Sequence, residues 1–271
     1  MQDASHPTFR VSVTAIVLFQ VAALFARSML ELSLRAQGMG SDVANDLSYL
    51  VVPPILMILT FPYLRTCKDS LRKLFSVADL TIRVTLLSIA LGLIMRLTYW
   101  ASLTLLIGTG VIGNEDPNAI VGPLIGFDCP PAAVFLLSLA IMAVVVPVTE
   151  EVMHRGFFLF GLLSRGKNLA IILSAIYFAL MHELSTYLPA FIVGLVLAVQ
   201  VLNFRALWGP IITHATYNAT ATIDWDCFQL IWNPPAGDPT IVKLAWASIP
   251  IIIAGVTLSL LIVREKRAGA S

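Results

Sequence analysis

The sequence is poor in charged residues, since Asp, Glu, Lys and Arg make up only 12% of its 271 positions. A soluble globular domain carries about 25% charged residues, so this chain has too few of them to cover a surface exposed to water. Hydrophobic residues make up 58% of the chain, which identifies the lipid bilayer as the solvent for most of it. A chain of this length accommodates about six to nine membrane helices of about 20 residues each.

Two further absences exclude other classes of protein. The formal net charge is only +1 and no block of Lys and Arg occurs, which argues against a nucleic-acid partner. The first apolar stretch, residues 11–30, is longer than the apolar region of a signal peptide and lacks a small-residue cleavage site. We therefore expect this stretch to stay in the mature protein as a membrane span.

The apolar stretches predict an all-α fold, a polytopic membrane helix bundle of about eight transmembrane helices with an active site inside it. Backbone polar groups must be paired in hydrocarbon, so each stretch is expected to be helical. The stretches are too continuous for a membrane β-barrel, and no internal repeat of the kind found in many transporters is visible. The predicted spans are residues 12–31, 48–64, 83–108, 132–162, 168–183, 187–204, 207–222 and 241–263.

The distribution of Lys and Arg predicts the orientation, because cytoplasmic loops are enriched in these residues. The loops at 109–131 and 223–240 contain neither residue type, whereas basic residues occur in the second, fourth and sixth loops and in the tail. Both termini are therefore expected to be cytoplasmic. The short loops favour a bacterial inner membrane. The basic residues of these three loops and of the tail are Arg65, Lys68, Arg72, Lys73, Arg165, Lys167, Arg205, Arg264, Lys266 and Arg267.

The chain has three cysteines. Cys129 and Cys227 both fall on the predicted outer face, where an oxidising environment would allow a disulfide between them. Two unpaired thiols near the interface are an equally good interpretation. Cys67 lies on the predicted cytoplasmic side and is expected to stay reduced.

Ionisable side chains at membrane depth are costly, so each one is a candidate functional residue. They are concentrated in the fourth, fifth and seventh predicted spans. Residues four apart share one face of a helix, whereas adjacent residues such as Glu150 and Glu151 point about 100° apart. Three pairs are therefore expected to share a face: Glu151 with Arg155, Phe178 with His182, and His214 with Asn218. His154 is the corresponding partner of Glu150.

These residues are sufficient for peptide hydrolysis. Glu150 in an apolar pocket is a candidate general base for water, and His182 is a second group to hold that water. His214 and Asn218 offer donors for the oxyanion that develops in the transition state. Glu151 and Arg155 are expected to support the site as an ion pair.

Other hydrolytic chemistries leave weaker signatures. No second His follows His182-Glu183 at the HExxH spacing, and neither a GxGD aspartyl motif nor a GxSxG serine motif occurs. Two His and one carboxylate are a catalytic zinc set, so zinc bound by Glu150, His182 and His214 is retained as the alternative to a metal-free site.

The order of these motifs resembles the CAAX-protease and bacteriocin-processing (CPBP, or Abi) family of intramembrane endopeptidases. The matching residues are Glu150-Glu151-x-x-x-Arg155, Phe178-x-x-x-His182 and His214-x-x-x-Asn218, together with Gly156, Phe157 and Phe158. The resemblance implies an eight-helix membrane fold and a glutamate-dependent protease with the roles given above. One branch of the family cleaves prenylated CAAX proteins after the lipidated cysteine, and the resemblance selects no branch.

The resemblance also suggests how the chain is divided. Residues 1–131 would form three membrane spans without a recognised motif. Residues 132–222 would form the catalytic core. Residues 223–271 would contain the last loop, the final span and a basic tail.

Each candidate residue also has a purely structural interpretation. If Pro147 starts a helix, Glu150 and Glu151 fall in its first turn, where carboxylates are favoured. His182 would then be a buried histidine bonded to a backbone carbonyl, and His214 and Asn218 would be interhelical hydrogen-bonding groups. Glu150 and His182 would also lie at different depths unless the fourth helix is tilted, or broken at Pro147.

Two other functions are compatible with buried Glu and His residues. A proton-coupled carrier uses such groups as relays, and a non-catalytic immunity or partner protein would retain the fold alone. An intramembrane protease acting on a membrane-associated or lipidated substrate is the leading hypothesis, because all three motifs are complete.

Overall fold

The computed structural model describes residues 12–109, 131–182, 186–222 and 239–264. Within these ranges every regular element is helical and no strand occurs. The elements, in chain order, are α1 (Val13–Ala36), α2 (Ser41–Tyr49), α3 (Val52–Leu74), η1 (Val77–Asp79), α4 (Ile82–Gly108), α6 (Ala132–Ala140), η2 (Ile141–Val145), α7 (Val146–Glu151), η3 (Val152–Leu159), α8 (Phe160–Leu162), η4 (Leu163–Arg165), α9 (Lys167–Leu180), α10 (Tyr187–Phe204), α11 (Trp208–Thr222) and α12 (Pro239–Arg264).

The fold is that of an integral, multi-pass membrane protein. In the described ranges, six helices are long and apolar enough to cross a membrane. Helix α9 has 14 residues and α11 has 15. At 1.5 Å per residue each is about 20 Å long, less than the hydrocarbon core of about 30 Å. The expectation of eight spans is therefore confirmed for six of them, and for α9 and α11 it stays a prediction.

The second predicted span needs correction at both of its ends. A separate short helix, α2, precedes it, and Pro53 and Pro54 lie in the first turn of α3. Proline is well tolerated there because the first N–H groups of a helix have no intrahelical partner. Helix α3 then continues to Leu74, ten residues beyond the predicted end at position 64, so the basic residues expected in a loop lie on a helix.

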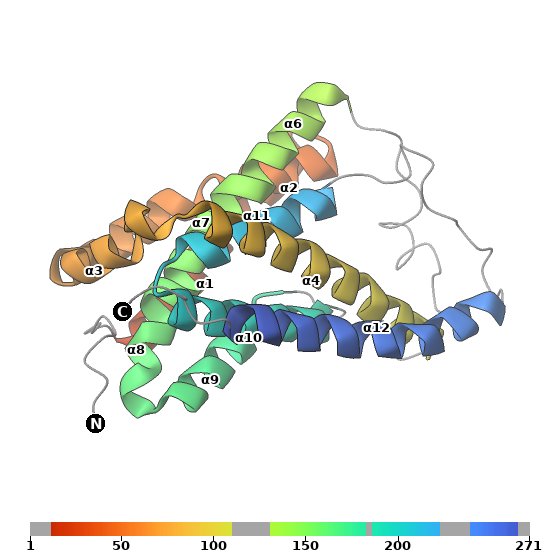
Figure 1. The fold of residues 1–271 in the computed structure, drawn as a ribbon. Helices are drawn as coiled ribbons and strands as arrows, with labels where there is room; N and C mark the ends of the chain where they lie inside the picture. The colour runs from red at the N-terminus through yellow and green to blue at the C-terminus, as the bar shows by residue number, and fades with distance from the viewer. Residues whose placement is uncertain (1–11, 110–130, 183–185, 223–238, 265–271) are drawn as a thin grey trace.

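Helices α4, α10, α11 and α12 pack around one another, and α9 runs back beside α10 (Figure 1). Two close contacts position the helices that carry the predicted site. A Cβ on Gly92 of α4 would lie 2.6 Å from the Thr213 carbonyl oxygen of α11. A Cβ on Gly194 of α10 would lie 2.9 Å from Cα of Ala175 in α9. These glycines allow the backbones to approach more closely than larger residues would permit.

Replacing Gly194 by alanine is expected to lower the free energy of unfolding by about 1–3 kcal/mol, because the new methyl group overpacks the contact with Ala175. The measurement is reversible unfolding in mixed detergent micelles. Gly40→Ala is the control, since nothing lies within 4 Å of a Cβ added at Gly40. Equal stability of the two variants would contradict the close packing of α9 on α10.

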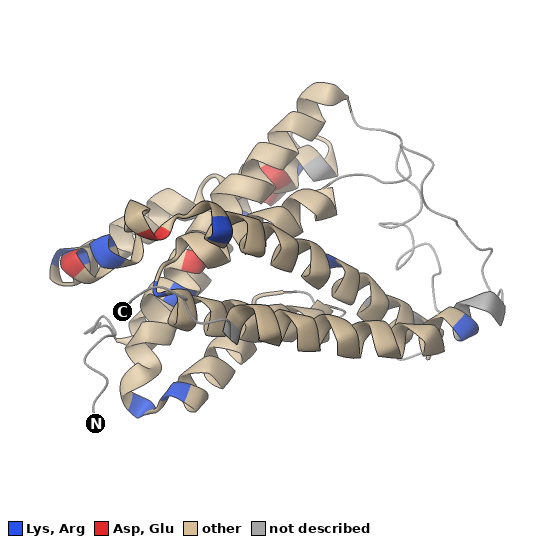
Figure 2. Ribbon diagram, in the orientation of Figure 1, with Lys and Arg blue, Asp and Glu red and all other residues tan. Residues whose placement is uncertain are grey.

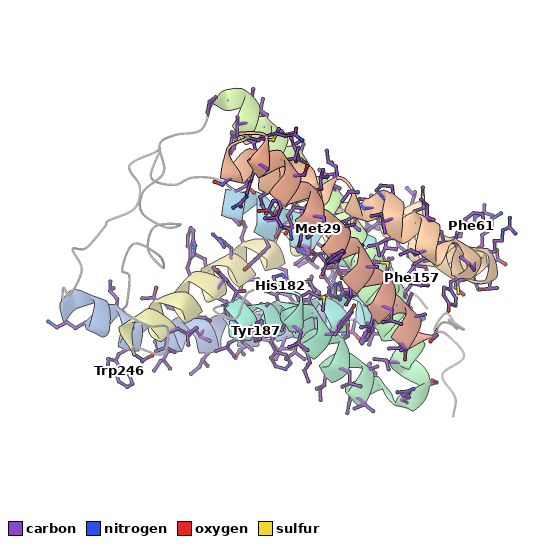
Figure 3. All side chains as sticks on the ribbon, turned by 180° about the vertical axis from the view of Figure 1, so that it is seen from behind. Met29, Phe61, Phe157, His182, Tyr187 and Trp246 are labelled. Atoms are coloured by element: carbon purple, nitrogen blue, oxygen red, sulfur yellow. The ribbon has the colours of Figure 1, made fainter. Side chains whose placement is uncertain are left out.

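Charged residues gather at a few places in the described chain (Figure 2). Lys and Arg lie on the C-terminal half of α3 and at the turn between η4 and α9, whereas α10 carries none of the charged residues (Figure 2). Large apolar side chains point outward from most helices, among them Phe61 and Trp246 (Figure 3). An apolar exterior of this kind fits a protein surrounded by lipid.

Candidate active site

The fourth predicted span is continuous from Ala132 to Arg165, and it changes helix type on both sides of the glutamate pair. Elements η2 and η3 are π-helical, and the short α-helix α7 between them holds Pro147, Glu150 and Glu151. In η2 the Val146 N–H donates to the Ile141 carbonyl, five residues back. The predicted break at Pro147 is therefore a change of helical pitch, of a kind often found at functional sites.

Glu151 lies at the centre of a fully buried network. Its Oε1 accepts a hydrogen bond from Nη1 of Arg155 at 3.0 Å, and Nδ1 of His214 lies 2.9 Å from the same oxygen. The side chains of Glu151 and Arg155 are both 0% exposed. This geometry confirms the expected pairing of the two residues across one helical turn. It also shows a third member, His214, which comes from α11.

Arg155 has two further contacts that hold it in place. Its Nη2 donates to the Gly194 carbonyl of α10 at 3.4 Å. Its guanidinium carbon lies 4.4 Å from the centre of the Phe178 ring. Arg155 thus connects the fourth span to α9 and α10, which is more than the single ion pair expected from the sequence.

Glu150 is more open than its neighbour. Its side chain is 25% exposed, and its Oε2 lies 4.0 Å from Nε2 of His214. That oxygen is buried and has no hydrogen-bond partner among the described residues. His214 therefore lies between the two glutamates, with Nδ1 directed at Glu151 and Nε2 directed at Glu150.

A small pocket adjoins Glu150 and is lined in part by residues of the N-terminal helices. It is mostly apolar, and Tyr49, Leu56, Val146 and Met153 contribute to its lining together with Glu150. The side chain of Glu150 therefore lines a pocket, whereas that of Glu151 is enclosed.

His182 lies at the end of α9 (Figure 3). Its Nδ1 is 2.8 Å from the carbonyl oxygen of Phe178, one turn earlier, as the structural interpretation of this residue expects. The same bond fixes the ring with Nδ1–H as donor and leaves Nε2 for other partners. The Phe178 ring packs beside His182 at 4.6 Å between centroids, as expected, and contacts His214 at 5.8 Å. The Phe178 ring therefore packs against the imidazole rings of both His182 and His214.

Asn218 is held by the irregular part of the fourth span. Its Nδ2 donates to the Met142 carbonyl at 2.9 Å. In a regular α-helix the Met142 carbonyl would accept from the Val146 N–H, but that group is directed to Ile141. The next N–H along the chain would be that of Pro147, which has none. The asparagine side chain thus satisfies a carbonyl that the π-helical stretch releases, and one of its two N–H groups stays available.

Asn218→Ala is expected to lower the free energy of unfolding by about 1–3 kcal/mol, because the Met142 carbonyl loses its donor. The same substitution is expected to lower kcat/KM. Asn203→Ala is a matched control, since Asn203 Nδ2 donates to the Val263 carbonyl at 2.6 Å away from the site. Both variants should lose stability in a detergent unfolding assay. If both variants lose the same amount of activity, Asn218 has no role in the reaction beyond its contribution to stability.

The sequence interpretation missed a second buried network next to the site. His154 was expected to face Glu150, but its Nε2 lies 2.8 Å from Nε2 of Gln20 on α1. The Tyr177 hydroxyl donates to Oε1 of Gln20 at 2.9 Å, and the His154 side chain is fully buried. The signal for this contact was the polar Gln20 in an otherwise apolar span. It ties the first helix to the fourth and fifth spans.

The remaining sequence predictions concern metals and cysteines. In the part of the chain that the structure describes, no group of three or more His, Cys, Asp or Glu side chains is arranged to hold a metal ion. Cys67 is a buried free cysteine. Cys129 and Cys227 lie outside the described residues, so their pairing stays a prediction.

Comparison with known proteins adds one finding. Residues 132–220 match the family model described as Type II CAAX prenyl endopeptidase Rce1-like. All six predicted site residues lie within this range: Glu150, Glu151, Arg155, His182, His214 and Asn218. No curated protein and no solved structure matches the chain.

Proposed function

Since residues 132–220 form an Rce1-like type II CAAX prenyl endopeptidase (CPBP/Abi) family domain, we propose that this chain is an intramembrane endopeptidase of the glutamic type. Its substrate is a membrane-associated or lipidated protein or peptide, and a glutamate-activated water hydrolyses the bond. Membership of the domain in this family implies a protease. The catalytic type and the substrate class are our proposal.

One observation carries the proposal. Glu150 Oε2 has no hydrogen-bond partner among the described residues, and it lies 4.0 Å from His214 Nε2 at the edge of an apolar pocket. Glu151, only one residue later, also has an Oε2 without a hydrogen-bond partner among the described residues, but its Oε1 is engaged by Arg155 and His214. Its side chain is 0% exposed, whereas that of Glu150 is 25% exposed and lines the pocket. Of the two carboxylates, Glu150 is therefore the one available to take a proton from water.

In the proposed reaction Glu150 acts first as a base and then as an acid. Glu150 accepts a proton from water, and the hydroxide attacks the carbonyl carbon of the scissile peptide bond. His214 in its protonated form and the second N–H of Asn218 donate to the resulting oxyanion. Protonated Glu150 then gives its proton to the leaving amine as the C–N bond breaks. His182 Nε2 helps to hold the water, while Glu151 and Arg155 position His214.

Zinc bound by Glu150, His182 and His214 is the alternative form of this proposal. These three side chains are not arranged to hold a metal ion in the described structure, so this form would require them to come closer together. Measurement of the metal content of the purified, active protein separates the two forms. Stoichiometric zinc that is lost together with activity would favour the zinc form.

We further propose that both termini are cytoplasmic and that the membrane is the inner membrane of a bacterium. The positive charges on α3 and at the turn before α9 support this orientation, because cytoplasmic segments are rich in Lys and Arg. Accessibility labelling of single cysteines introduced at Arg165 and at Thr109 tests it. Labelling of position 109 from the cytoplasm would contradict it.

The experiment that tests the proposed function compares protein termini in cells that express the wild type and cells that express Glu150→Gln at equal level. Mass spectrometry of membrane proteins is expected to find a set of new termini only with the wild type. These termini would identify the substrate and its cleavage site. If the termini are identical but the mutant still has a phenotype, the protease hypothesis is rejected, and transport or partner binding becomes the favoured function.

A further inference from the structure

The pocket beside Glu150 contains polar side chains that are free to bind a small polar molecule. Its lining includes Tyr49, Thr149 and Glu150 among mostly apolar residues. Oε2 of Glu150 has no hydrogen-bond partner among the described residues, and the same holds for the Tyr49 hydroxyl. The Thr149 hydroxyl donates to the Val145 carbonyl at 2.7 Å, so its oxygen can still accept a hydrogen bond.

The short helix α2, which ends at Tyr49, is fixed between α1 and α6. Arg27 of α1 donates from Nη2 to Oδ1 of Asn45 at 2.5 Å, and its guanidinium carbon lies 3.7 Å from the centre of the Tyr49 ring. On the opposite side, the Ser138 hydroxyl of α6 donates to the Asp46 carboxylate. A cation–π contact and hydrogen bonds to charged groups therefore hold α2, and with it the ring of Tyr49.

Tyr49 is the polar side chain of the N-terminal helices that can serve a ligand at Glu150. Gln20 also lines the pocket, but its amide nitrogen contacts His154 and its oxygen accepts from the Tyr177 hydroxyl. Tyr49 is not engaged in this way, and it lies close enough to Glu150 for the two side chains to interact electrostatically. Since α2 precedes the range matched by the family model, that match assigns no role to Tyr49.

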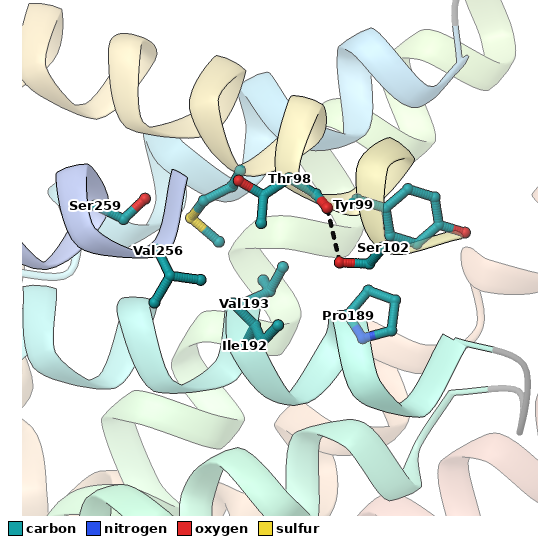
Figure 4. A pocket seen from close by; sticks show the side chains of 9 residues that line it. Thr98, Tyr99, Ser102, Pro189, Ile192, Val193, Val256 and Ser259 are labelled. Carbon is teal, nitrogen blue, oxygen red and sulfur yellow. Dashed lines mark hydrogen bonds between the residues drawn. The ribbon is translucent and has the colours of Figure 1, made fainter. Parts of the chain in front are cut away.

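A second pocket, between α4, α10 and α12, differs from the first in its chemistry (Figure 4). Among the described residues that line it there is no carboxylate, and none of the proposed site residues. The Ser102 hydroxyl donates to the Thr98 carbonyl at 2.8 Å, and the Thr98 hydroxyl donates to the Ile94 carbonyl at 2.8 Å. Of the two pockets, the one at Glu150 is therefore suited to a water that is to lose a proton.

We propose that this pocket binds the water consumed in the reaction, and that Tyr49, Thr149 and Glu150 hold it. The pocket has room for a water molecule, and a buried water needs roughly two to four polar partners. The water donates one hydrogen to Glu150 and the other to the Thr149 oxygen, and it accepts from the Tyr49 hydroxyl. One lone pair is left to attack the substrate carbonyl carbon as Glu150 takes the first proton. The inference rests on the proposed function and adds two contacts, from Tyr49 and Thr149, to the water beside Glu150.

The kinetic test compares Tyr49→Phe with Tyr63→Phe in the full-length protein in nanodiscs, on a peptide found in the comparison of termini. Tyr49→Phe keeps the ring that packs on Arg27 and removes only the hydroxyl. Its kcat is expected to fall about tenfold with KM unchanged, as for the loss of one hydrogen bond in the transition state. Tyr63→Phe is the matched control and should cleave as the wild type, because Tyr63 lies on α3 outside the pocket lining, with its ring 6.2 Å from that of Phe19. Wild-type kinetics for Tyr49→Phe, or a raised KM with unchanged kcat, would overturn the inference.

A structure that shows ordered water separates this inference from the proposed function. In the substrate-free wild type, a water is expected within hydrogen-bond distance of the Tyr49 hydroxyl and the Glu150 carboxylate. Tyr63→Phe should keep this water and Tyr49→Phe should lose it. If the wild type cleaves its substrate but has no water at this place, the inference is wrong and the protease remains. If the water is present but Glu150→Gln yields the same protein termini as the wild type, the pocket binds water and the proposed hydrolysis is rejected.

Discussion

Replacing Arg155 by methionine is expected to lower the free energy of unfolding by about 3–5 kcal/mol, the largest effect on stability that we expect from the site. The substitution leaves the Glu151 carboxylate fully buried without its cation, and the Gly194 carbonyl loses its donor. Methionine keeps the apolar stem of the side chain but lacks the guanidinium, so the loss reflects charge, hydrogen bonding and the space that the guanidinium fills. Reversible unfolding in mixed detergent micelles measures it.

Two controls separate this cost from general damage. The double variant Glu151→Gln with Arg155→Met removes both charges and is expected to recover part of the stability, because no unpaired ion remains. Arg35→Met removes one of the two arginine partners of Glu31 at the same helical spacing, but in a more exposed pair. That change is expected to cost at most about 1 kcal/mol. Equal losses for Arg155→Met and Arg35→Met would contradict the buried network.

Replacing Glu150 by glutamine is expected to lower kcat/KM by about 10²- to 10⁴-fold, the usual contribution of a general base. Glutamine keeps the shape of the side chain but does not accept a proton from water. Stability should change little, because Oε2 of Glu150 has no hydrogen-bond partner among the described residues. The measurement is cleavage of a peptide found in the comparison of termini, with unfolding followed in the same preparation.

The different effects expected of Glu150→Gln and Arg155→Met distinguish a catalytic role of Glu150 from a structural one. Glu150→Gln should fold normally and fail to cleave, whereas Arg155→Met should lose stability first. Asp69→Asn, a carboxylate on the C-terminal half of α3 that does not line the pocket, is the activity control. If Glu150→Gln cleaves at the rate of the wild type, Glu150 is no general base, and the proposed mechanism is wrong.

The sequence located most of the membrane-spanning helices. The predicted span 187–204 coincides with α10, and the fourth span, predicted to end at 162, ends at Arg165. The physical reason is the lack of backbone partners in lipid, which makes every long apolar stretch a helix. Helix α2, by contrast, was missed because Ser41–Tyr49 is short and polar, and its contacts rather than its hydropathy hold it in place.

The sequence also determined the local geometry inside single helices. The contact of Glu151 with Arg155 and that of Phe178 with His182 follow from spacing alone, because residues four apart meet on any α-helix. Even across the π-helical stretch η3, which begins at Val152, the first of these pairs is kept.

Only the tertiary structure decided which partners meet across helices. Spacing along the helix pairs Glu151 with Arg155, but only the packing of α11 brings His214 to Glu151 and leaves Glu150 facing a pocket. Gln20 and His154 are 134 positions apart, and no local rule connects them. The burial of a carboxylate depends on how whole helices pack against one another. That packing is set by contacts between segments far apart in the sequence. Residue spacing along one helix does not predict those contacts.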